Sequence, residues 1–180
     1  INPDMVASVG FSTGGFEAKY GDKMSSALDI TYKRPTQTEG SLSASLLGAT
    51  GYFGLVAKNM TWTNGLRYKT NQYLLGSLDT KGEYDPSFLD YQTYLSWKSG
   101  KRWQVDFIGN ISENHYNFEP EDRETNFGTM ENVKSFKVYF DGHEKDLFRT
   151  FFGSLSLTHF LKNNKTSVSL LASAFSTKEQ

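Results

Sequence analysis

The feature that most constrains this chain is an alternation of apolar and polar side chains, sustained over stretches of about ten residues. In the stretch 102–114, Trp103, Phe107 and Ile111 occupy odd positions, whereas Gln104 and Asn110 occupy even positions. Successive side chains of a strand point to opposite faces, so this stretch predicts a strand with one apolar and one polar face. Soluble strands average about 5–6 residues, whereas strands that cross a membrane need about 9–11. The length of the alternation therefore favours membrane-spanning strands.

The same pattern divides the rest of the chain into further strands. The predicted strands are 5–13, 26–33, 41–47, 52–57, 60–69, 88–97, 102–114, 150–160 and 166–177, with 133–140 as a further candidate. The pair 41–47 and 52–57 is expected to turn near Gly48 and Ala49, and residues 71–81 could hold a helical turn.

Four large apolar residues interrupt the alternation, because they occupy positions that otherwise carry the polar side chains of their strands. These residues are Phe152, Phe160, Leu171 and Phe175. In a membrane barrel they would pack against an internal plug, and in a soluble sandwich they would form a second core face. The pattern alone leaves both alternatives open.

The links between the predicted strands differ in length in a regular way. Those near residues 58–59, 99–101 and 162–164 are tight, whereas those near 71–86 and 115–148 are long and polar. Outer-membrane barrels have short turns at one rim and long loops at the other. The chain is therefore predicted to be all-β, as an antiparallel up-and-down meander that forms part of a transmembrane β-barrel.

Composition is consistent with this fold and excludes some functions. Aromatic residues make up 15% of a chain whose mean hydropathy is −0.52, which suits strands with one apolar and one wet face. The net charge of −1 gives no electrostatic case for nucleic acid or for an anionic membrane surface as a partner. The sequence contains no cysteine, which excludes disulfides and thiolate chemistry.

No pattern in the sequence predicts an enzyme, a metal site or a cofactor. The three histidines, His115, His143 and His159, are too scattered for a metal site. Asp106 and Glu113 are the best candidates for a catalytic carboxylate pair, but their opposite parity puts them on different faces of a strand. The acidic run 119–124 could bind a cation or a polar ligand, or could be a solvated loop.

Aromatic residues in or beside the long links are the candidate ligand-binding residues. They are Tyr73, Tyr84, Tyr116 and Phe118. Aromatic rings stack on sugar faces and supply a large contact area. The same residues could instead belong to an interfacial aromatic girdle or to the packing of the loops.

The N-terminal stretch resembles the end of the plug domain of TonB-dependent outer-membrane receptors. The resemblance rests on the run 5–15, the pair Tyr20 and Gly21, and the strand 27–33 that ends at a lysine. Asp29 stands where many members of the family have asparagine, and the run 16–26 is similar to the variant common in Bacteroidetes. The resemblance implies that residues 1–36 are the C-terminal part of a plug and residues 37–180 are the first barrel strands. The boundary would lie at Pro35, which cannot donate to a ladder.

The resemblance also implies a function for the larger protein to which this chain would belong. That protein would lie in the outer membrane of a Gram-negative bacterium and import a glycan, a siderophore or a similar nutrient. Its partners would be the TonB energy-coupling complex and, in some systems, a surface lipoprotein. The chain by itself is expected to self-associate, through its strand edges or through the face that carries Trp103 and Phe107. The alternative is a soluble all-β carbohydrate-binding module.

Overall fold

A computed structural model describes residues 1–15, 17, 20–21, 25–70, 82–120, 123–129, 132–139, 142, 144–162 and 166–180. Apart from a single 3-10 turn, η1 (Pro3–Met5), the regular elements in these ranges are all β-strands, and their pairings are all antiparallel. The predicted antiparallel all-β fold is confirmed. Within the described ranges, no helix has the length and apolar character required to cross a membrane.

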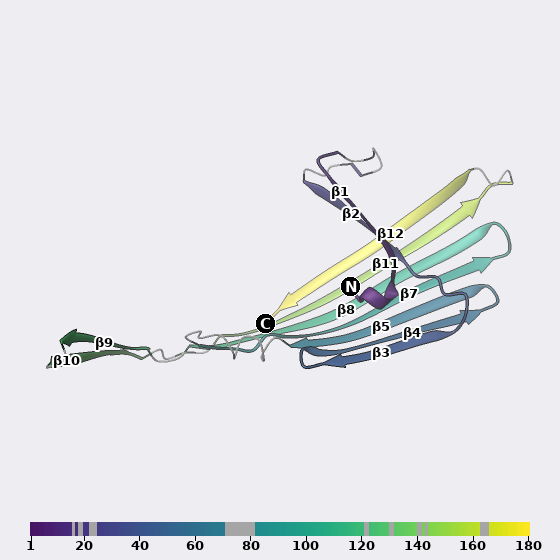
Figure 1. Cartoon of the computed structure of the whole chain (residues 1–180). Coiled ribbons are helices and arrows are strands. Elements are labelled where there is room, and N and C mark those ends of the chain that lie inside the picture. Colours follow the sequence, from purple (N-terminus) through teal and green to yellow (C-terminus); the bar gives the residue numbers. More distant parts are fainter. Residues whose placement is uncertain are drawn as a thin grey trace.

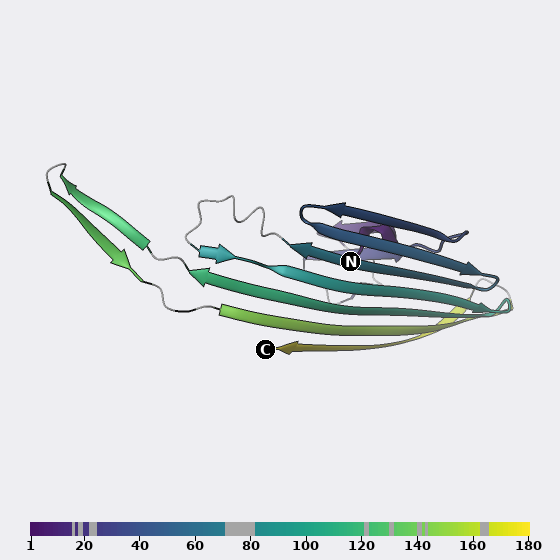
Figure 2. The same cartoon turned by 90° about the horizontal axis from the view of Figure 1, so that it is seen from below.

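The main sheet contains eight strands, seven of which follow one another in the order of the chain. They are β3 (Glu39–Ser45), β4 (Gly48–Ala57), β5 (Met60–Thr70), β7 (Ser87–Ser99), β8 (Trp103–Pro120), β11 (Glu144–Phe160) and β12 (Ser167–Glu179). The short strand β6 (Gly82–Tyr84) pairs with the far end of β8. Figures 1 and 2 show the meander as a long, curved sheet, with β3 and β12 as its two edges.

Two separate hairpins complete the fold. One joins β1 (Val6–Thr13) to β2 (Ser26–Tyr32), and the other joins β9 (Arg123–Thr129) to β10 (Asn132–Val138). The β9–β10 hairpin stands well beyond the ends of β8 and β11 (Figure 2). Strand β10 agrees with the predicted strand 133–140 as far as residue 138, whereas the predicted helical turn within 71–81 lies outside the described residues.

Two predicted boundaries are wrong. The β3–β4 turn lies at Leu46 and Leu47, because Gly48 and Ala49 already pair with β5. Gly48 has a φ of +132°, and a Cβ at this position would lie 2.1 Å from the carbonyl oxygen of Tyr68. Glycine is therefore required here for a close approach of two strands inside the ladder. The expected long loop 115–148 is also much shorter, since β8 continues to Pro120 and β11 begins at Glu144.

The main sheet is apolar on its exposed face and polar on its buried face. The strand register places Trp62, Leu95, Phe107 and Leu155 in one row across four strands, and all but Leu95 are among the exposed large side chains. On the opposite face, the buried side chains include Thr63, Asp90, Gln92, Ser96 and Gln104. A water-soluble sheet has the reverse arrangement, because burial of apolar surface drives its folding.

The N-terminal segment covers part of the polar inner face. Met5 is completely buried there and forms a small cluster with Tyr52 and Tyr94. A Cβ on Gly65 of β5 would lie 2.7 Å from the Met5 sulfur, so the absence of a side chain makes room for η1. The core of the described structure therefore lies between this segment and the inner face of the sheet.

Candidate functional site

The candidate site is the polar inner face of the sheet where the N-terminal segment lies on it. The backbone N–H of Asn2 donates to Oε1 of Gln92 over 3.2 Å, and Nδ2 of Asn2 donates to the carbonyl of Gly51 over 3.3 Å. Nε2 of Gln92 donates in turn to the hydroxyl of Tyr32 over 2.9 Å. Burial raises the pKa of Tyr32 further above its usual value, and this hydroxyl is protonated at neutral pH. The hydrogen bonds that Asn2 donates to Gln92 and Gly51 thus hold the N-terminal segment on the sheet.

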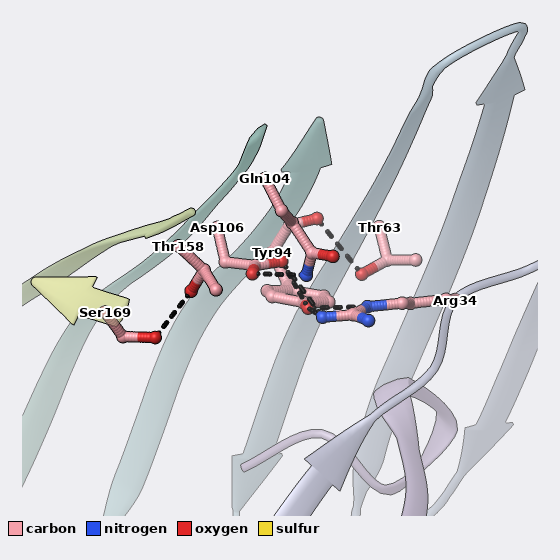
Figure 3. Close-up of polar contacts among 7 residues, drawn as sticks. All are labelled: Arg34, Thr63, Tyr94, Gln104, Asp106, Thr158 and Ser169. Carbon is pink, nitrogen blue, oxygen red and sulfur yellow. Dashed lines mark hydrogen bonds and ion pairs between the residues drawn. The ribbon is translucent and has the colours of Figure 1, made fainter. Parts of the chain in front are cut away.

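A second attachment joins the linker after β2 to strands β7 and β8 (Figure 3). Arg34 donates to the Tyr94 hydroxyl from Nε over 2.9 Å and from Nη2 over 2.8 Å. Nη2 also donates to Oδ1 of Asp106 over 3.1 Å, and the Tyr94 hydroxyl donates to the same oxygen over 2.9 Å. Gln104 donates to the other oxygen of Asp106 over 2.6 Å. Both oxygens of the Asp106 carboxylate therefore accept hydrogen bonds, Oδ1 from a guanidinium and a phenol and Oδ2 from an amide, which fixes the orientation of the carboxylate.

Residues around this network explain its position. Arg34 precedes Pro35, a context that favours extended backbone and directs the linker away from β2. Tyr94 is buried, and its carbonyl accepts a hydrogen bond from the Thr63 hydroxyl over 3.4 Å. On the neighbouring strands β11 and β12, the Thr158 and Ser169 hydroxyls lie 2.9 Å apart (Figure 3). The inner face is thus a polar surface, and Arg34 from the linker forms an ion pair with Asp106 on this face.

Substitution of Arg34 by alanine should loosen the N-terminal segment without unfolding the sheet. The backbone N–H of Asn2 donates to Oε1 of Gln92 on β7 over 3.2 Å, so the hydrogen exchange of this amide reports on the attachment. Because the Arg34 side chain is 46% exposed, we expect the exchange rate of the Asn2 amide to rise only about fivefold. Lys178→Ala, which removes the same charge on β12, should leave the exchange of the Asn2 amide unchanged. Equal rates in the two variants would show that Arg34 does not hold the segment.

A hollow of about 420 Å³ lies on the same inner face, next to a second ion pair. Arg67 donates to both carboxylate oxygens of Asp90, over 2.9 and 3.1 Å, and its guanidinium lies 4.7 Å from the centre of the Phe88 ring. The other lining residues include Tyr32, Asn110, Ser112 and Phe152. Because Arg67 and Asp90 neutralise each other, the hollow presents aromatic rings with neutral hydrogen-bonding groups.

Three of the four predicted ligand-binding aromatics belong to described strands and are not among the residues that line this hollow. Tyr116 and Phe118 belong to the far end of β8, where Tyr84 of β6 pairs in register with Phe118. Tyr116 lines a different hollow of about 450 Å³, together with Ser87, Asp146 and others. Tyr73 lies outside the described residues. The structure therefore pairs the backbones of Tyr84 and Phe118 and places Tyr116 in the wall of a separate hollow.

The residues of the plug-like motif form a contact within the first hairpin. The Tyr20 hydroxyl donates to the carboxylate of Asp29, which pairs with Gly10 in the β1–β2 ladder. No described atom lies within 4 Å of a Cβ built at Gly21. The N-terminal segment approaches the sheet closely at Gly65.

The carboxylates considered for catalysis are separated as their parity predicted. Asp106 faces Arg34 on the inner side, whereas Glu113 accepts a hydrogen bond from Arg149 over 2.6 Å and contacts His115 over 2.7 Å. The described part of the chain contains no group of His, Asp or Glu side chains arranged to hold a metal ion.

The sequence patterns missed Arg34 and Tyr94 as site residues. A signal for Tyr94 existed, because it shares the parity of Asp90 and Gln92 and is therefore an aromatic residue on a polar face. Arg34 had no comparable signal, since a single arginine in a linker is ordinary.

Comparison with known proteins adds no family or homologue. No protein-family model, no curated protein and no solved structure matches this chain.

Proposed function

We propose that this chain is part of a TonB-dependent outer-membrane receptor, consisting of the end of its plug and the first strands of its barrel. The larger protein would bind a nutrient such as a glycan or a siderophore at the cell surface and import it. The energy would come from the inner membrane through the TonB complex. The chain would contribute part of the barrel wall and part of the plug that closes the lumen, and it would carry out no catalytic step.

The inverted distribution of side chains carries the proposal. The strands of the main sheet expose Trp, Phe and Leu side chains on one face, and the central strands β5, β7 and β8 bury Thr, Asp, Gln and Ser on the other. A barrel in a bilayer needs an apolar outside and tolerates a polar interior. From Trp103 to Ile111 the apolar face of β8 extends for eight steps, about 27 Å along the strand at about 3.4 Å per residue. With a strand tilt of about 40°, this length corresponds to a height of about 21 Å, close to that of an outer-membrane barrel.

The position of the N-terminal segment supports the plug assignment. In a barrel, the polar face to which Asn2, Met5 and Arg34 attach would be the lumen wall. Phe152 and Phe175, which interrupt the alternation, pair in register on this same face and line the hollow beside Arg67. The carbohydrate-binding alternative fits less well, because a soluble module would leave Trp62, Trp97 and Trp103 about two-fifths exposed to water on a broad apolar face.

Deletion of the gene tests the proposal in cells. Receptor function predicts that the chain is found in the outer-membrane fraction and that the deletion abolishes uptake of one nutrient, which the intact gene restores. The panel of nutrients should include glycans, siderophores and corrinoids. Unchanged uptake of every compound, or recovery of the protein in the soluble fraction, would contradict the proposal.

A further inference from the structure

The strand ends that flank three short links lie side by side along one end of the main sheet (Figure 1). The links connect β4 to β5, β7 to β8, and β11 to β12, and residues 163–165 of the third link lie outside the described residues. The backbone N–H of Lys98 donates to the Asn59 carbonyl over 2.8 Å, and that of Phe160 donates to the Arg102 carbonyl over 2.8 Å. These bonds tie each link to the next. We call the described charged residues of these links and of the adjoining strand end the short-turn rim: Lys58, Lys98, Lys101, Arg102 and Lys162.

The short-turn rim carries charge of one sign only. All five of its residues are exposed, and none of them forms an ion pair with another described residue. The sequences 58–59, 98–102 and 161–166 contain no aspartate or glutamate. Five cations are therefore gathered on one edge of a chain whose net charge is −1. The net charge of the whole chain gave no case for binding to an anionic surface, because it does not show that five cations lie together at one end of the sheet.

All three tryptophans of the chain adjoin this rim. The register pairs Trp97 with Met60, Trp103 with Ser99, and Trp62 with Leu95, so the three indoles lie on the apolar face close to the tight links. Tryptophan prefers the boundary between hydrocarbon and headgroups, where its ring is apolar and its N–H remains wet. The opposite end of the same face carries tyrosine instead and charges of both signs, Glu113 and Arg149 among them. The two ends of the sheet are therefore chemically different.

A hollow of about 400 Å³ lies at the centre of the rim. Its lining residues are Lys98, Gly100, Lys101, Trp103, Gln104 and Phe160. Two lysines, an amide and two aromatic rings are the groups that suit a phosphodiester attached to an apolar tail.

We propose that the short-turn rim is a docking surface for the headgroups of anionic phospholipids. The phosphodiester of one lipid lies between Lys98 and Lys101, and Trp103 lies at the level of the glycerol. A bilayer surface fits better than an acidic protein, because the cations adjoin a row of indoles and a continuous apolar face. The inference rests on the membrane location in the proposed function, but it does not require transport.

Flotation of the 180-residue chain with lipid vesicles tests the inference. One set of vesicles contains phosphatidylcholine alone, and the other contains equal amounts of phosphatidylcholine and phosphatidylglycerol, at low and at high salt. The chain should bind the anionic vesicles more tightly, and salt should weaken this preference. Neutralising one rim cation should cost about fivefold in affinity for anionic vesicles, and the triple variant Lys98→Gln, Lys101→Gln, Arg102→Gln should lose about a hundredfold.

The matched control removes three cations elsewhere, by Lys134→Gln, Lys137→Gln and Lys145→Gln on β10 and β11. It should retain nearly all of the affinity, and an equal loss in the control would overturn the inference. Competition by inorganic phosphate at constant ionic strength would also overturn it, by revealing a site for free phosphate. Equal binding to the two vesicle types would contradict this inference alone, whereas binding to neither would also contradict the membrane location in the proposed function.

Discussion

Replacing Leu155 by lysine should destabilise the protein in a bilayer by about 2–4 kcal/mol, the cost of a lysine facing lipid near the midplane. Leu155 lies in the middle of the apolar stretch of β11, is 48% exposed, and has Phe107 and Ala172 as its neighbours across the sheet. In a water-soluble protein the same change at a half-exposed position would alter stability by no more than about 0.5 kcal/mol. The free energy of unfolding in lipid vesicles, measured with denaturant, distinguishes the two cases.

Ser154→Lys provides the matched control on the same strand. Ser154 precedes Leu155 and faces the polar side of the sheet, where a lysine can remain hydrated. This variant should unfold at nearly the denaturant concentration of the parent chain. If the two lysine variants were equally stable in vesicles, the apolar face of the sheet would not be facing lipid.

Replacing Arg67 by methionine should cost about 3–5 kcal/mol, the typical result of removing one partner from a buried ion pair. The Asp90 side chain is only 5% exposed, and Arg67 is the partner that donates to both of its carboxylate oxygens. Without the guanidinium, the nearly buried carboxyl group would lose its charged partner. Equilibrium unfolding of the single variant measures this loss.

The double variant Arg67→Met with Asp90→Leu should recover most of that stability, since an apolar pair of similar volume can replace a buried ion pair at little cost. Arg149→Met is the comparison on the opposite face, where the side chains of Arg149 and Glu113 are 47% and 34% exposed. Water screens this pair, so its loss should change stability little. A double variant no more stable than Arg67→Met would show that the guanidinium acts mainly through packing on Phe88.

The sequence predicted the strands well because alternation is a local property that each strand carries by itself. Trp103, Phe107 and Ile111 are spaced by fours, and this spacing alone identifies one face of β8. The ends of the strands were predicted less well, because they depend on hydrogen bonds to a neighbour. Strand β8 continues past Asn114 since β11 and β6 pair with it there, although the apolar alternation has stopped.

The candidate site was harder to predict than the fold, because its contacts join distant parts of the sequence. Arg34 and Asp106 are 72 residues apart, and only the return of the linker across β7 brings them together. The side chains on the polar face were identified as a class by their parity, but their partners were not. The cationic rim was missed for a related reason, since its members are spread over three links that become neighbours only when the strands pair.

The two open edges of the sheet constrain how such a protein can be assembled. Strand β12 pairs with β11 on one side only, so a row of N–H and C=O groups along its other side faces outward. Water can satisfy these groups, but hydrocarbon cannot, and each one left without a partner would cost several kcal/mol. In the membrane location that we propose, each edge would therefore need a pairing partner or a protein cover wherever it meets hydrocarbon. Pairing of the edges and entry into the bilayer would then be coupled events.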